Sequence, residues 1–300
     1  MRAEIEAFDG FCWRSGFPWS ILVFDGVIAV NNRLRVVGVM GVSPGGDRMR
    51  YVAGSVLLSA VAMISFPVLA ADLATDTTSE EPAKHWMAFS GIDMNTGGSF
   101  YGFSGFQFAP GKGGLDESGL RFWLLGEAGR YQYPAGTEKI RGTYLETDAL
   151  IGYGFEGEGR SVNFYVGLNA QSHRLSAADP ENPVQGDKAG AKFYTDAWYN
   201  PTPATLLAGE GSYSTVFGTY YATGKFGQSF TGGKTLDDKQ FYIGPQITLL
   251  GNERYQEWRV GAHVTSFNFG KVDFEIGAGY QHNTDNGAGA YAIFEINTKF

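Results

Sequence analysis

The feature that most restricts the fold of this chain is an alternation of apolar and polar residues that recurs along most of its length. In segment 272–281, VDFEIGAGYQ, apolar side chains occupy every second position, and acidic, amide or glycine residues occupy most of the others. Segment 162–171, VNFYVGLNAQ, has the same period. A period of two places successive side chains on opposite faces of an extended strand. Such segments are therefore predicted to be β-strands with one apolar and one polar face.

Turn signals divide the chain after position 85 into segments of similar length. The predicted strands lie near 86–94, 99–109, 119–132, 143–155, 160–174, 190–199, 204–214, 218–230, 240–250, 256–268, 271–282 and 289–300. Composition agrees, because 43 glycines disfavour a helical protein and an aromatic content of 15% suits pleated strands. The expected class is all-β with about 12 strands.

A signal peptide is predicted in front of these strands. Segment 49–72 has Arg48 and Arg50 at its start, no charge from Tyr51 to Ala71, and small residues at its end. A membrane-spanning helix is the alternative, because the uncharged run is long enough to cross a bilayer. We expect translation to begin at Met40 or Met49. Residues 1–39 would then be an extension that is not translated. The rest is expected to comprise a signal peptide over 40–71, a polar segment over 72–85 and a barrel domain over 86–300.

The strand pattern by itself fits a soluble barrel as well as a membrane barrel. A secreted, glycine-rich and aromatic-rich chain that ends on the alternating segment FEINTKF is typical of an antiparallel up-and-down transmembrane β-barrel of the bacterial outer membrane. A soluble periplasmic β-protein is the alternative. With both ends in the periplasm, the long connection 176–190 is expected outside the cell, whereas segment 231–240 is unusually long for an inner turn.

Several classes of function are disfavoured by composition. Cys12 is the only cysteine, so disulfide scaffolds and cysteine nucleophiles are not expected. Without the first 70 residues the chain has 17 basic and 26 acidic side chains, which makes it a poor nucleic-acid binder. Asp179, Glu181 and Asp187 could offer oxygen ligands to calcium, but their spacing is not that of an EF-hand, and a solvated loop is favoured. No metal or cofactor site is predicted.

Barrel enzymes that hydrolyse acyl chains need a nucleophile beside a base. His263 and Ser266 have opposite parity on one strand, as do Ser172 and His173, so neither pair is expected to form a catalytic dyad. No catalytic residue is predicted.

Aromatic residues on the polar face are the candidate ligand contacts. Parity with charged or amide neighbours places four of them in the lumen, namely Trp123, Tyr165, Trp198 and Tyr242. A neutral sugar ring needs an apolar face for stacking with hydrogen-bonding groups around it. These residues are therefore candidate contacts for a neutral sugar such as a glucan, although filling of the lumen is the favoured interpretation.

Longer blocks of the sequence resemble a known family. The blocks SGIDMNTGGSFYGFSGFQFAP, ADPENPVQGDKAGAKFYTDAWY, GSYSTVFGTYYATGKFG and YIGPQITLLGNERYQEWRVGAH are similar to those of the cellulose biosynthesis protein BcsS family of alphaproteobacteria, from about Trp86 to Phe300. Gln246 departs from the family pattern, where an acidic residue is expected. The resemblance implies an accessory of cellulose synthesis or secretion in the outer membrane or periplasm, with no family-wide catalytic residues.

The predicted function is thus a non-catalytic outer-membrane barrel of cellulose biosynthesis, without cofactors. Its expected partners are outer-membrane lipid, cellulose as a neutral glucan, and other cellulose-secretion components, with no nucleic acid. A lipid-modifying barrel enzyme of the acyl hydrolase type and a small porin are the alternatives.

Overall fold

The computed structural model describes residues 82–231 and 240–300. The predicted extension, the predicted signal peptide and most of the polar segment 72–85 lie outside these residues. In the described part, no helix has the length and apolar character that a membrane crossing requires.

Twelve antiparallel strands form one closed barrel, in which each strand pairs with its neighbours in sequence. Their bounds are β1 (Trp86–Asn95), β2 (Phe100–Phe108), β3 (Gly119–Ala135), β4 (Glu138–Gly157), β5 (Arg160–Leu175), β6 (Gly186–Thr202), β7 (Thr205–Ser214), β8 (Tyr220–Gln228), β9 (Tyr242–Gly251), β10 (Gln256–Phe269), β11 (Val272–Asn283) and β12 (Gly287–Lys299). A 3-10 turn, η1 (Gly114–Asp116), follows β2. The predicted class and strand number are confirmed.

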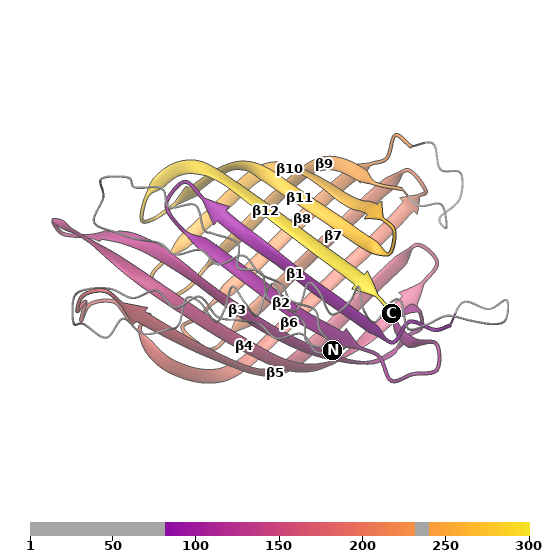
Figure 1. Cartoon of the computed structure of the whole chain (residues 1–300), viewed down its shortest axis with the longest axis horizontal. Helices are drawn as coiled ribbons and strands as arrows, with labels where there is room; N and C mark the ends of the chain where they lie inside the picture. Colours follow the sequence, from indigo (N-terminus) through magenta and orange to yellow (C-terminus); the bar gives the residue numbers. More distant parts are fainter. Residues whose placement is uncertain (1–81, 232–239) are drawn as a thin grey trace, which may run out of the picture. The chain divides into compact units, whose positions relative to one another are not determined.

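The first and last strands close the barrel. β1 pairs with β12 from Met87 opposite Lys299 to Asn95 opposite Tyr291. Beyond this ladder, Trp86 and Phe300 exchange two backbone hydrogen bonds of 2.8 Å. Figure 1 shows β1 in indigo beside β12 in yellow, with the strands tilted around the barrel. Closure leaves no unpaired sheet edge, and a barrel with an unpaired edge could not be stable in lipid.

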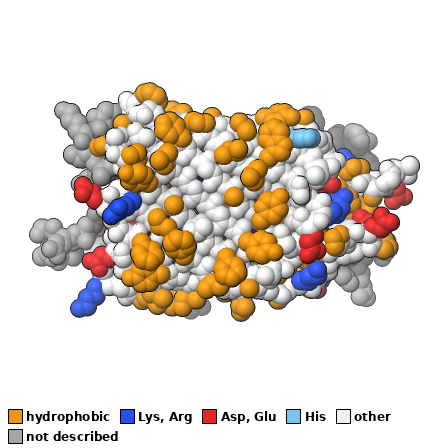
Figure 2. Space-filling model, turned by 180° about the vertical axis from the view of Figure 1, so that it is seen from behind, with side chains coloured by type: hydrophobic (Ala, Val, Ile, Leu, Met, Phe, Trp, Pro, Cys, Tyr) orange, Lys and Arg blue, Asp and Glu red, His pale blue; other side chains and the backbone are white. Residues whose placement is uncertain are grey.

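The alternation seen in the sequence separates an apolar outer wall from a polar interior. Leu168 on β5 is 72% exposed, whereas its neighbour Asn169 is 1% exposed. Phe164 and Ile247 are also exposed, at 54% and 55%. Figure 2 shows hydrophobic side chains over the middle of the wall and charged side chains at its two ends. Apolar residues outside and polar residues inside are the arrangement of a membrane barrel and the inverse of a soluble one.

The two ends of the barrel differ. We call the end that holds Trp86 and Phe300 the terminal end and the opposite end the distal end. β3, β4, β5 and β6 have 16 to 20 residues each, more than the roughly 9–11 that cross a bilayer. The β3–β4 hairpin projects at the distal end, at the left of Figure 1.

Two strands begin earlier than the sequence pattern indicates. β4 starts at Glu138 instead of 143, and β6 starts at Gly186 instead of 190, so the connection predicted over 176–190 covers only 176–185. The added residues are held by the backbone ladder, in which Asp187 pairs with Ser172, and by the ion pair of Asp187 with Arg174 at 2.7 Å. These strand ends carry polar residues on both faces, so the apolar alternation does not extend to them.

Candidate binding chamber

A chamber of about 330 Å³ lies inside the barrel, between its middle and its distal end. This volume is at the lower end of the range typical of small-molecule sites, which is about 300–1,000 Å³. Polar and aromatic side chains from most of the strands line it. Its aromatic lining includes Tyr101, Phe103, Trp123, Tyr144, Tyr194 and Tyr221.

Trp123 is the centre of the aromatic wall. Its ring centroid lies 4.5 Å from that of Phe89, 5.0 Å from that of Tyr194 and 5.6 Å from that of Tyr165. These separations are those of packed aromatic pairs. Tyr165 lies behind this wall and is 3% exposed, with its hydroxyl bound to the Gln107 amide. Trp123 therefore presents a supported apolar surface to the chamber.

The other two predicted glucan contacts lie nearer the terminal end. Trp198 and Tyr242 make an edge contact with ring centroids 6.2 Å apart. Both are tied to Asn200, which accepts a 2.6 Å hydrogen bond from Trp198 Nε1 and donates one of 3.0 Å to the Tyr242 hydroxyl. All four predicted residues thus lie in the interior, but only Trp123 lines the chamber. Glucan binding by the four stays a prediction.

Ion pairs organise the polar part of the chamber. Lys192 Nζ lies 2.5 Å from a carboxylate oxygen of Glu146 and 2.5 Å from one of Asp148. Arg259 contacts Asp93 at 2.7 Å and also binds Glu257. Each of these cations thus contacts two acidic side chains in the interior of the barrel.

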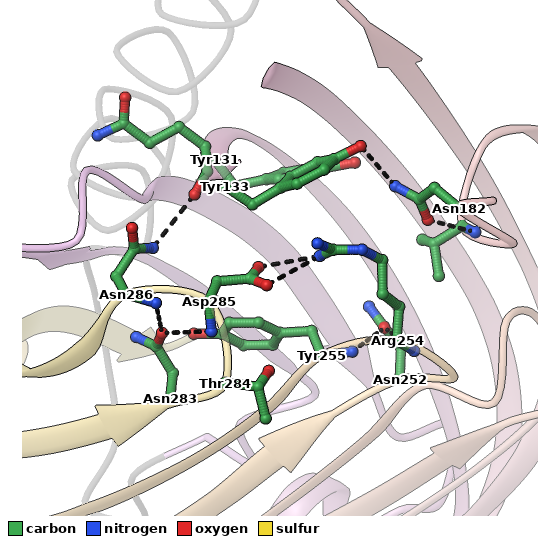
Figure 3. Close-up of polar contacts among 12 residues, drawn as sticks. Tyr131, Tyr133, Asn182, Asn252, Arg254, Tyr255, Asn283, Thr284, Asp285 and Asn286 are labelled. Atoms are coloured by element: carbon green, nitrogen blue, oxygen red, sulfur yellow. Dashed lines mark hydrogen bonds and ion pairs between the residues drawn. The ribbon is translucent and has the colours of Figure 1, made fainter. Parts of the chain in front are cut away.

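Loops from four strand pairs meet over the distal end, as Figure 3 shows. Arg254, in the β9–β10 loop, places Nη1 3.0 Å from both carboxylate oxygens of Asp285, in the β11–β12 turn. Its guanidinium lies 3.8 Å from the ring centroid of Tyr133 at the end of β3. The Tyr133 hydroxyl donates to Asp179 and accepts from Asn182, both in the β5–β6 loop, at 2.8 Å. We call these five residues the distal clasp.

Two further hydrogen bonds lie beside the distal clasp. Asn286 donates a 3.2 Å hydrogen bond to the Gln132 carbonyl, which joins the β11–β12 turn to β3. Tyr255, next to Arg254, donates to Glu257 inside the barrel. Burial, and then the neighbouring Glu257 carboxylate, raises the pKa of Tyr255, so its phenol remains a donor. The distal mouth is thus bridged by side chains.

The sequence of the barrel matches one family model. The model of the cellulose biosynthesis protein BcsS family covers residues 87–300. The chain belongs to the BcsS family. Its barrel is therefore that of a cellulose biosynthesis protein, and the resemblance found in the sequence is confirmed.

Three solved structures with similar folds have low sequence identity to this BcsS-family chain. KdgM porin has 12% identity and a TM-score of 0.39, with 71% of this chain and 99% of that chain covered. LpxR from Salmonella typhimurium has 11% identity and a TM-score of 0.41, with 72% and 100% covered. The NalP translocator domain from Neisseria meningitidis has 12% identity and a TM-score of 0.40, with 81% and 98% covered. Such likenesses carry no information on activity. Among curated proteins, none matches this chain.

The sequence predicts only part of the histidine contacts in the BcsS-family barrel. His263 is hydrogen-bonded to Thr265 at 2.9 Å, and Thr265 donates to Glu275 at 2.9 Å. His263 and Thr265 lie two positions apart on one strand, so the sequence alone places them on the same face. His263 and Thr265 are 1% and 4% exposed and lie away from the chamber lining, so the contact is interior packing. In residues 82–231 and 240–300, no histidine is hydrogen-bonded to a serine.

The acidic residues of the β5–β6 region have separate roles. Asp179 accepts the hydrogen bond from Tyr133, and Asp187 pairs with Arg174. Within the part of the chain that the structure describes, no group of three His, Cys, Asp or Glu side chains is arranged to hold a metal ion.

Proposed function

We propose that this BcsS-family chain is a non-catalytic accessory of bacterial cellulose biosynthesis or secretion in the outer membrane, and that its chamber binds glucan. The family match over residues 87–300 is the observation that carries this proposal. The chamber adds a supported aromatic surface at Trp123, surrounded by hydrogen-bonding groups. An aromatic face with polar groups at its rim suits the two kinds of surface on a sugar ring.

The outer wall supports the proposed location. Apolar side chains cover the middle of the barrel and charged side chains lie at its ends, which suits a lipid bilayer. With the terminal end in the periplasm, the long strands and the distal clasp face the outside of the cell. Residues 40–71 are proposed to act as a signal peptide that is removed, which leaves the barrel domain 86–300 to be inserted. Outer-membrane lipid, cellulose and other secretion components are the proposed partners.

The chamber favours an accessory role over the two alternatives. An acyl hydrolase needs an accessible nucleophile beside its base, and the contacts of His173 and His263 are with tyrosine, threonine, glutamine and backbone groups. A porin needs an open passage, whereas the clasp of Tyr133, Arg254 and Asp285 bridges the distal mouth. A mouth bridged in this way favours the holding of a ligand over free diffusion.

A deletion strain tests the function. Loss of the gene is expected to reduce cellulose at the cell surface, measured by Congo red or calcofluor staining, while synthase activity in isolated inner membranes stays unchanged. A plasmid copy should restore staining, and a copy with Trp123→Ala should restore it only in part. Trp258→Ala is the matched control, because this tryptophan lies on the outer wall and is 43% exposed. Normal staining in the deletion strain would contradict the proposal.

A further inference from the structure

The charges that line the chamber do not balance. Seven carboxylate side chains and three cationic side chains face it. Each cation is already engaged with acids: Lys192 with Glu146 and Asp148, Arg254 with Asp285, and Arg259 with Asp93 and Glu257. The chamber is therefore left with more acidic than basic side chains.

Glu127 and Glu295 carry that excess most clearly. Both side chains line the chamber, and neither has a hydrogen bond or ion pair within the described residues. Glu210, also in the lining, accepts a 2.9 Å hydrogen bond from the Tyr194 hydroxyl but has no cationic partner. Asp93 adds a buried acceptor, since its Oδ1 has no partner although the other oxygen binds Arg259. An unpaired acid away from bulk water takes up a proton unless a cation compensates its charge.

An aromatic ring lies between the two unpaired glutamates. Backbone pairing places Glu295, Gly91, Phe103 and Glu127 in one row across β12, β1, β2 and β3. A Cβ atom on Gly91 would come within 2.4 Å of Phe103 Cζ, so the ring lies over the glycine. Three strand spacings separate the glutamates, about 14 Å along the wall. Phe103 thus fills the gap between two carboxylates.

The aromatic rings and carboxylates together indicate which kind of cation the chamber would bind. Alkylammonium groups are attracted both to carboxylates and to the faces of aromatic rings within about 6 Å. A bound metal ion would instead need several ligands converging on one point, and the described residues contain no such group. The wall of Phe103 and Trp123 therefore favours an organic ammonium over a metal ion.

We propose that the chamber binds a sugar that carries an ammonium group, with Glu127 and Glu295 as its counter-charges and Phe103 and Trp123 as its stacking surface. This inference rests on the proposed function for the saccharide nature of the ligand, and it adds that the preferred saccharide is cationic. The distal clasp lies on the outer side of the chamber, so its opening would admit the ligand from outside the cell.

Two disaccharides with the same ring skeleton test directly whether the chamber prefers a charged sugar. Fully deacetylated chitobiose has the same linkage as cellobiose. It differs only in that one hydroxyl on each ring is replaced by an ammonium group. Binding of both to the purified, folded barrel protein in detergent at pH 7 and low salt is measured by isothermal titration calorimetry. The expected result is at least tenfold tighter binding of the ammonium sugar. Paired Glu127→Gln and Glu295→Gln substitutions should remove that preference, so that the two sugars bind with affinities within about twofold of each other. Heat-dependent gel migration shows that each variant is folded.

Glu138→Gln is the control, because this acid is exposed at the start of β4, outside the chamber. The Glu138→Gln variant should keep the preference for the ammonium sugar. Equal affinity of the unmodified protein for the two sugars would overturn the cationic inference and leave the glucan proposal standing. Binding of neither sugar would overturn both the inference and glucan binding in the chamber. A preference that survives in the paired glutamate variant would also overturn the assignment.

Discussion

Arg254 and Asp285 form a two-oxygen contact that joins two loops over the distal mouth of the barrel, with Nη1 3.0 Å from each carboxylate oxygen. The same guanidinium lies over Tyr133, so one side chain connects three parts of the mouth. Planar stacking and paired hydrogen bonding are both properties of arginine that lysine does not reproduce. This arrangement makes Arg254 the residue on which closure of the mouth depends most.

Removal of Arg254 should open the mouth. Arg254→Ala is expected to raise single-channel ion conductance of the barrel in planar bilayers, because the loops lose their shared contact. Arg254→Lys should have an intermediate effect, since it keeps the charge without the planar contact. Arg174→Ala is the control, because Arg174 forms an exposed ion pair with Asp187 at the outer rim, and such pairs contribute little. Equal conductance of all the proteins would show that the clasp does not restrict the mouth.

The apolar outer wall should tolerate apolar but not charged residues. Leu168 is 72% exposed near the middle of β5. Leu168→Lys is expected to lower the free energy of unfolding in phospholipid bilayers by about 2–4 kcal/mol, because the lysine would face hydrocarbon. Leu168→Phe should have little effect. Urea titration of the folded barrel in vesicles measures both. A lysine variant as stable as the unmodified protein would mean that this face does not contact lipid.

Lys192 should stabilise the interior by neutralising two acids. Its contacts with Glu146 and Asp148 are both 2.5 Å, and all three side chains are buried. Lys192→Met should cost about 3–5 kcal/mol, since it leaves two carboxylates without a counter-charge. Adding Glu146→Gln and Asp148→Asn should recover most of that loss. The comparison uses the same urea titration, and no recovery in the triple variant would show that the lysine acts through packing.

Much of the barrel could be predicted from the sequence because its main determinant is local. Alternation places Phe164 and Tyr165 on opposite faces without knowledge of any partner strand, and alternation with turn signals predicted all twelve strands. Strand ends such as 138–142 were missed because they follow the hydrogen bonds of β3 rather than an apolar period. Tyr194 was missed although it shares the parity of Trp198.

The chamber could be predicted only in part, because it depends on register. Parity places Trp123 and Glu127 on one face, but it does not show that Phe103 lies between Glu127 and Glu295, which are 168 positions apart in the sequence. The clasp was not predictable at all, since Arg254 and Asp285 lie in separate loops with no periodic pattern. Contacts between loops require the closed barrel before they can be identified.

Direct binding of a cello-oligosaccharide to the purified barrel tests the central claim most closely. Trp123 packs against Phe89 and Tyr194 at the chamber wall, whereas Trp258 lies outside on β10. Stacking on an aromatic ring contributes about 0.5–1.5 kcal/mol, so Trp123→Ala should weaken binding about two- to tenfold in calorimetry. Trp258→Ala should leave the affinity unchanged. An absence of binding, or equal affinity of the two variants, would contradict a glucan site in the chamber.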